Sequence, residues 1–207
     1  MRVLLDDQPI SPDPGSVAEA MDAVRAHTED TDRLIIQIEA DGAPVDAELL
    51  TDPPDDDAGI GELRLTTANR LDFIRVTIGD VAEALDHVVE HQSRAADLIE
   101  DGDAAAASEP LSEALTKWQA VHAVVDQAAQ LLGVDPGEIE IEPPEGSTGA
   151  TTGAACIEKL LEALEEVRRA MSDQDTAALA DTLREDMDAV SRDWRALLDA
   201  LSQRAAA

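Results

Sequence analysis

Aromatic residues are almost absent from this chain of 207 residues. They make up 1% of the sequence, as Phe73, Trp118 and Trp194, whereas hydrophobic residues as a whole make up 44%. A core built from this sequence must therefore be aliphatic, made of leucine, alanine, valine and isoleucine, and interdigitating helices can pack such a core. The length fits one large domain or two small ones.

Cysteine and long apolar runs are equally scarce. Cys156 is the single cysteine, so no disulfide can form within the chain. The sequence contains no run of about 18 apolar residues, and we therefore expect no membrane-spanning helix. The first ten residues lack the apolar stretch of a secretory signal, so we expect a cytoplasmic protein.

Positive charge is the third deficit. Lys117 and Lys159 are the only lysines, and the formal net charge is −31 with an isoelectric point near 4.1. Such a charge repels phosphate backbones and anionic lipids, so we expect no nucleic-acid or membrane partner. The acidic residues are spread along the whole chain, as on a strongly solvated surface; a compositional bias of the whole genome also accounts for them.

Motifs that would bind a nucleotide or build a nucleophilic site are missing. The chain has no phosphate-binding loop, no dinucleotide-binding glycine pattern and no nucleophile elbow. The aspartate-rich segments at 52–57 and 97–103 lack the alternating oxygen ligands, the central glycine and the closing glutamate of a calcium-binding EF-hand loop. We therefore expect no cofactor and assign no catalytic residue.

The strongest pattern that is present lies between Leu71 and Ile99. Its apolar residues recur in steps of three and four, which predicts one long amphipathic helix with a sustained heptad stripe. Gln92 is the only polar residue in this stripe. The stripe consists of Leu71, Ile74, Ile78, Val81, Leu85, Val88, Ala95 and Ile99.

Residues 1–69 predict a small α+β domain. We expect strands at Arg2–Leu5, Gln8–Ile10, Arg33–Ala40, Ala43–Val45 and Gly61–Thr67, and a loop at 52–59. Ser16 with Glu19 three residues later predicts the capped start of a helix after the first strand pair. The order of strand pair, helix, strand pair and strand is compatible with a β-grasp-like (ubiquitin-like) arrangement.

Residues 70–207 predict helices throughout. The first helix ends near 101–103, the second is capped by Asp103 or Ser108 and ends at Gly133, and Pro110 is tolerable only in a first turn. A third helix spans about 155–171, and a fourth follows a cap at Asp175. Short links at 101–103 and 173–175 predict two helical hairpins, which a flexible connector at 134–154 joins into an antiparallel four-helix bundle.

One segment fits a metal-binding motif. His87, Glu90 and His91 match the pattern H-x-x-E-H, in which inverted zinc peptidases use both histidines as zinc ligands and the glutamate as the base. No distant residue stands out as a third ligand. The alternatives are a pair of solvated helix histidines and an adventitious divalent-metal site.

Three further residues are candidates for interaction or for fixing register. A polar residue in an apolar stripe, such as Gln92, can set the register of a bundle or meet a partner. It can equally be a hydrogen-bonded residue at the bundle's margin. Trp118 and Trp194 are the two large aromatic residues, one in the later part of each predicted hairpin.

These observations favour a non-enzymatic protein-interaction module, such as an adaptor, a chaperone-like protein or an assembly factor, with a protein partner or self-association. One alternative is a zinc-dependent hydrolase built on His87, Glu90 and His91. A second alternative is a structural subunit of a larger assembly, in which the N-terminal sheet docks through an edge strand.

Overall fold

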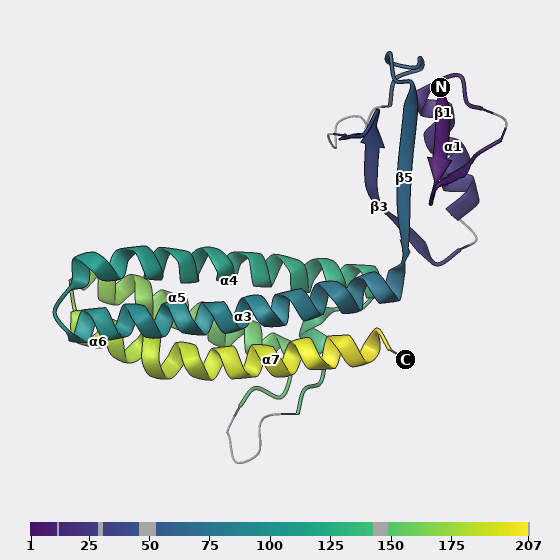
Figure 1. Cartoon of the computed structure of the whole chain (residues 1–207). Helices are drawn as coiled ribbons and strands as arrows, with labels where there is room; N and C mark the ends of the chain where they lie inside the picture. Colours follow the sequence, from purple (N-terminus) through teal and green to yellow (C-terminus); the bar gives the residue numbers. More distant parts are fainter. Residues whose placement is uncertain (12, 29–30, 46–52, 143–148, 207) are drawn as a thin grey trace. The chain divides into compact units, whose positions relative to one another are not determined.

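The computed structural model describes residues 1–11, 13–28, 31–45, 53–142 and 149–206, and it has a mixed α+β architecture (Figure 1). The contacts between residues divide the chain into two compact units, Met1–Phe73 and Ile74–Ala207. A sheet and one helix form most of the first unit, and the second unit is helical. The prediction of an α+β protein is therefore confirmed.

The first unit contains a five-stranded sheet with the strand order β2-β1-β5-β3-β4. Strands β1 and β5 are parallel neighbours, and the other neighbouring pairs are antiparallel. The strands lie within two residues of the predicted bounds: β2 and β4 end one residue earlier than expected, and β5 begins one residue later and ends two residues later. Their bounds are β1 Arg2–Leu5, β2 Gln8–Pro9, β3 Arg33–Ala40, β4 Ala43–Pro44 and β5 Glu62–Asn69.

Helix α1 (Val17–Thr28) packs against this sheet. The hydroxyl of Ser16 accepts a hydrogen bond from the backbone N–H of Glu19 at 3.1 Å, as the capping pattern predicts. The Glu19 carboxylate in turn accepts from the N–H of Gly15 at 2.8 Å. The core of the unit is aliphatic apart from one methionine and consists of Val3, Leu5, Val17, Ala20, Met21, Val24, Ile38, Leu63 and Leu65.

The hairpin between β3 and β4 turns at Asp41 and Gly42. Both residues have positive φ angles, 49° and 82°, which is the conformation that an Asp-Gly turn between right-twisted strands requires. The Asp41 carboxylate also accepts a hydrogen bond from the N–H of Glu62 at 2.8 Å, which joins the turn to the start of β5. Of the loop predicted at 52–59, residue 52 lies outside the described residues, and no helix or strand forms at 53–59.

The second unit is built from helices that share one hydrophobic core. From Ile74 to Ile99, every residue of the predicted α3 stripe is buried, Gln92 included, so the heptad spacing correctly identifies the inner face of this helix. The helices are α3 (Arg70–Glu100), α4 (Ala104–Leu132), α5 (Gly153–Asp173), α6 (Thr176–Asp181) and α7 (Met187–Arg204).

The start of α4 decides between the two caps that the sequence allows. The Asp103 carboxylate accepts a hydrogen bond from the N–H of Ala106 at 3.1 Å, so Asp103 is the N-cap. Pro110 then lies inside α4 and beyond its first turn, contrary to the expectation that only a first turn would tolerate it. Pro110 is buried, and this burial offsets part of the cost of the backbone hydrogen bond that proline cannot donate.

The predicted fourth helix is interrupted by a π-helical turn, η2 (Thr182–Asp186), between α6 and α7. The apolar residues Leu179, Leu183 and Met187 follow one another in steps of four and four, one residue more than a heptad contains. A π turn absorbs one extra residue, so all three side chains remain on the buried face.

The described residues of the connector pack against the helical core. Ile139 and Ile141 are buried, and a β-bridge pairs Glu140 with Thr152 after the short 3-10 helix η1 (Pro136–Glu138). A side chain at Gly153 would place its Cβ 1.8 Å from the carbonyl oxygen of Pro136, so this contact requires glycine. Residues 143–148, the centre of the connector that we predict to be flexible, lie outside the described residues.

Candidate functional site

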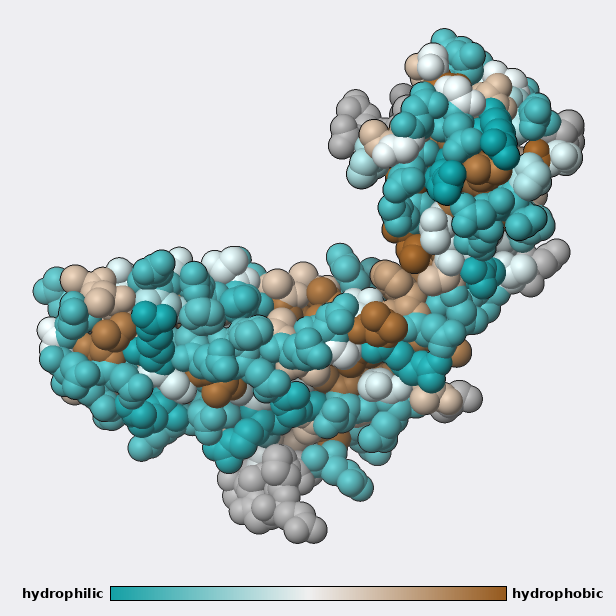
Figure 2. Space-filling view, viewed as in Figure 1, coloured by the Kyte–Doolittle hydropathy of each residue, from teal (hydrophilic) through white to brown (hydrophobic). Residues whose placement is uncertain are grey.

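The helical unit has a largely hydrophilic surface with scattered apolar patches (Figure 2). Among the hollows on it is a groove of about 540 Å³ between α3 and α7. Leu85 and Val89 of α3 and Ala196 of α7 are the apolar residues that line it. Leu85 is buried, whereas Val89 and Ala196 are half-buried, so part of this apolar lining is open to solvent.

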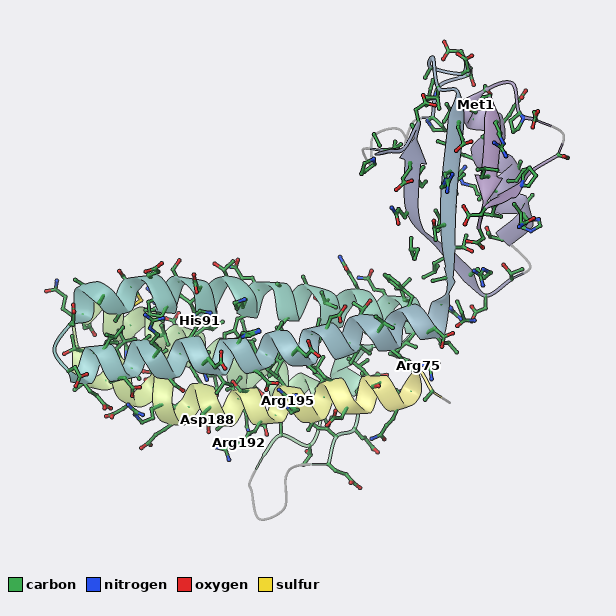
Figure 3. The ribbon with its side chains drawn as sticks, viewed as in Figure 1. Met1, Arg75, His91, Asp188, Arg192 and Arg195 are labelled. Carbon is green, nitrogen blue, oxygen red and sulfur yellow. The ribbon has the colours of Figure 1, made fainter. Side chains whose placement is uncertain are left out.

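Charged residues flank this apolar lining. Arg192 pairs with Asp188 at 3.1 Å within α7, and Arg195 pairs with Asp86 of α3. Arg195 also donates a hydrogen bond to the carbonyl oxygen of Ala82 at 3.0 Å, so this side chain joins the two helices. Figure 3 shows Asp188, Arg192 and Arg195 along α7.

A second hollow, of about 500 Å³, adjoins the first along α7. The two hollows share Glu142, Ala196 and Asp199, and the second is lined further by Glu140 and Ala200, among others. Together they form what we call the α3/α7 groove, in which the connector supplies residues beyond the two helices. In the described part of the chain, no basic side chain forms an ion pair with Asp199, Glu140 or Glu142.

Gln92, predicted as a register or interaction residue, lies next to this groove. Its Nε2 atom donates a hydrogen bond to the hydroxyl of Ser191, a groove-lining residue of α7, at 3.4 Å. The Ser191 hydroxyl donates to the carbonyl oxygen of Met187 at 2.8 Å. The Oε1 atom of Gln92 is buried and has no hydrogen-bond partner among the described residues. Gln92 therefore links α3 to α7, but its buried oxygen without a hydrogen-bond partner lowers the free energy of unfolding.

Trp118 and Trp194 meet in the core of the helical unit. Their rings pack edge to face with centroids 5.6 Å apart, and the His122 ring lies 5.8 Å from Trp194. The indole N–H of Trp194 donates to the carbonyl oxygen of Cys156 at 3.2 Å, whereas that of Trp118 has no partner in the described part of the chain. Both side chains are buried, so their contacts are with the core.

The sequence analysis did not identify an ion pair whose carboxylate is buried. The side chain of Asp193 is only 4% exposed, and its Oδ2 atom lies 2.8 Å from the Nζ atom of Lys159. The same oxygen accepts a hydrogen bond from the N–H of Ala150 at 3.0 Å. Asp193 thereby joins the end of the connector to α5 and α7. One signal in the sequence was the rarity of lysine, since Lys159 is one of only two.

Cys156 lies beside this ion pair and is buried. Burial in the core, with a smaller contribution from the nearby Asp193 carboxylate, raises the pKa of its thiol to about 12. The thiol therefore stays protonated at neutral pH, and protonated thiols are poor nucleophiles and poor metal ligands.

The histidines of the H-x-x-E-H segment lie in different surroundings. The side chain of His87 is 61% exposed and its Nδ1 atom lies 3.3 Å from Glu90, whereas that of His91 is 24% exposed and its Nδ1 atom lies 3.0 Å from Glu113 of α4. Within the described ranges, no group of three or more His, Cys, Asp or Glu side chains is arranged to hold a metal ion. Zinc binding by His87 and His91 stays a prediction.

In the first unit, a cluster of polar side chains joins Asp6 to Thr67 and Arg33. The Asp6 carboxylate accepts hydrogen bonds from the hydroxyl and the N–H of Thr67 at 2.6 and 2.7 Å, and from Arg33 at 3.1 Å. The Thr67 hydroxyl, together with its N–H and the Arg33 charge, lowers the pKa of Asp6 against the opposing effect of burial. These contacts hold the turn after β1 against β5 and β3.

Comparison with protein-family models, curated proteins and solved structures finds no match to this chain. None of the described helices combines the length and the apolar character that a membrane crossing requires. Any functional conclusion must therefore come from the chain's own surfaces.

Proposed function

We propose that this protein is a non-enzymatic protein-interaction module and that the α3/α7 groove is its binding surface. The observation that carries this proposal is the partly exposed apolar lining of the groove, formed by Val89 and Ala196 among charged side chains. Grooves of this kind accept one apolar face of a partner segment, while the polar rim limits where that segment can lie.

We infer a β-grasp-like arrangement for the first unit and an antiparallel four-helix bundle of two hairpins for the second. The strand order β2-β1-β5-β3-β4, with a parallel central pair and α1 between β2 and β3, supports the β-grasp assignment. The shared core of α3, α4, α5 and α7 and the short links at 101–103 and 173–175 support the bundle. Such a bundle is a rigid base for a surface groove.

The test is affinity capture from the native host with two variants of the full chain. Ala196→Trp fills the groove, and Ala123→Trp places the same side chain on an exposed position of α4 that does not line it. We expect a partner protein that the wild type and Ala123→Trp retain and Ala196→Trp loses. Partners that all three proteins capture equally would show that binding does not use the groove.

A further inference from the structure

We propose, building on the interaction function above, that the α3/α7 groove takes a basic amphipathic helix of a partner protein. Two properties of the groove define this occupant: its shape with its apolar lining, and its unbalanced charge. The partner helix would place aliphatic side chains against Val89 and Ala196 and direct lysine or arginine side chains toward the acidic rim.

The length of the groove fits a helical segment. Its α7 side runs from Asp188 to Gln203, which corresponds to about 22 Å at about 1.5 Å per residue. A partner helix of about 15 residues covers this distance in about four turns and presents a continuous apolar stripe along one face. The groove's accessible apolar residues are Val89, Ala196 and Ala200, which are half-buried and spread along it, so apolar contacts are available over much of its length.

The charges of the groove are unbalanced. Arg192 and Arg195 are already paired, with Asp188 and Asp86 respectively. The remaining acidic residues, Asp199, Glu140 and Glu142, have no basic partner in the described part of the chain, so the groove keeps a negative surplus. A basic partner supplies the missing countercharges.

The charge of the whole chain supports the same occupant. A net charge of −31 speeds the approach of a basic partner and slows that of an acidic one. A second copy of this chain would bring another 31 negative charges to the groove, so self-association through this surface is disfavoured. Nucleic acids and anionic membranes are repelled for the same reason.

The experiment measures fluorescence anisotropy of three synthetic 16-residue peptides with the full-length protein at about 0.15 M salt, where surface charges more than ~8 Å apart are screened. The first peptide places leucine on one helical face and lysine on the other. The second has the same composition with the leucines distributed around the helix, and the third replaces every lysine of the first by glutamate. The second peptide controls for attraction between net charges alone.

Two charge-reversal variants localise the binding. Glu142→Lys combined with Asp199→Lys reverses the unpaired rim charges, whereas Asp101→Lys combined with Asp173→Lys changes the net charge equally at exposed helix ends outside the groove. We expect the first peptide to bind at least about tenfold more tightly than the second, and only the rim variant to lose about tenfold in affinity.

Equal binding of the first two peptides, equal losses in the two variants, or preference for the acidic peptide would each overturn the basic-helix proposal. The capture experiment with Ala196→Trp separates this failure from that of the proposed function. A neutral or acidic partner that depends on Ala196 would leave the interaction function standing and refute only the basic helix.

Discussion

The ammonium of Lys159 and the carboxylate of Asp193 lie 2.8 Å apart across α5 and α7, and the Asp193 side chain is only 4% exposed. A carboxylate this deeply buried requires a countercharge, because removing an ion from water costs several kcal/mol. The pair also fixes the end of the connector, since Asp193 accepts a hydrogen bond from Ala150. Asp193 of α7 thus joins the end of the connector to α5.

Lys159→Met should destabilise the protein by about 2–3 kcal/mol, because it leaves the buried Asp193 carboxylate without its cation. This loss is smaller than for a fully buried pair, because the Lys159 side chain is 39% exposed. Urea unfolding followed by circular dichroism measures this loss. Arg168→Met, which breaks an exposed pair with Glu165, is the control and should change the midpoint little. Equal effects of both variants would mean that the buried pair has no special role.

Gln92→Leu should raise the free energy of unfolding by about 1 kcal/mol. The substitution removes a buried oxygen that has no hydrogen-bond partner among the described residues. Ser191 keeps its hydrogen bond to Met187 in this variant. Gln127→Leu, at an exposed position of α4, is the control. Light scattering tests the second role: if Gln92 sets the register, Gln92→Leu should populate additional oligomeric states. A less stable variant would refute the predicted cost.

Cys156 should react with a disulfide reagent at pH 8 only after unfolding, because burial holds the pKa of its thiol at about 12 in the folded protein. The pKa of the Cys156 thiol is higher in the folded state than its unfolded value of 9.0. Its contribution to the stability of the folded state is therefore fully present below pH 9 and is lost as the pH rises from about 9 toward 12. Between pH 7 and pH 10, the wild type should therefore lose about 1 kcal/mol relative to Cys156→Ala. Rapid modification of the native protein would contradict this.

Asp6→Asn should destabilise the first unit at neutral pH, because the ionised carboxylate accepts hydrogen bonds from Thr67 and Arg33. These contacts lower the pKa of Asp6, so its stabilising contribution is present above the unfolded value of 3.8 and is lost as the pH falls through the folded pKa. The difference between wild type and variant should shrink below pH 3.8 in acid unfolding. A difference that is constant across this range would show that the Asp6 charge is not responsible.

The periodic spacing of apolar residues was enough to locate the inner face of α3. Ile74 and Ile99 lie 25 positions apart and still share one buried face, because the position of a residue around a helix depends only on local backbone geometry. The caps at Ser16 and Asp103 are equally local, since each bonds a backbone N–H three residues away. These features could be read from the sequence for that reason.

The sequence by itself determined the α+β class and the apolar stripe of α3, because both follow from local periodicity. It also determined the acidic character of the chain, which follows from composition. The tertiary structure alone decided the pairing of Lys159 with Asp193, the link from Gln92 to Ser191 and the position of the α3/α7 groove. Lys159 and Asp193 are 34 positions apart in the sequence, and Gln92 and Ser191 are 99 positions apart. These contacts depend on which helices become neighbours and at what register, and that is settled only when the separate apolar stripes pack into one core.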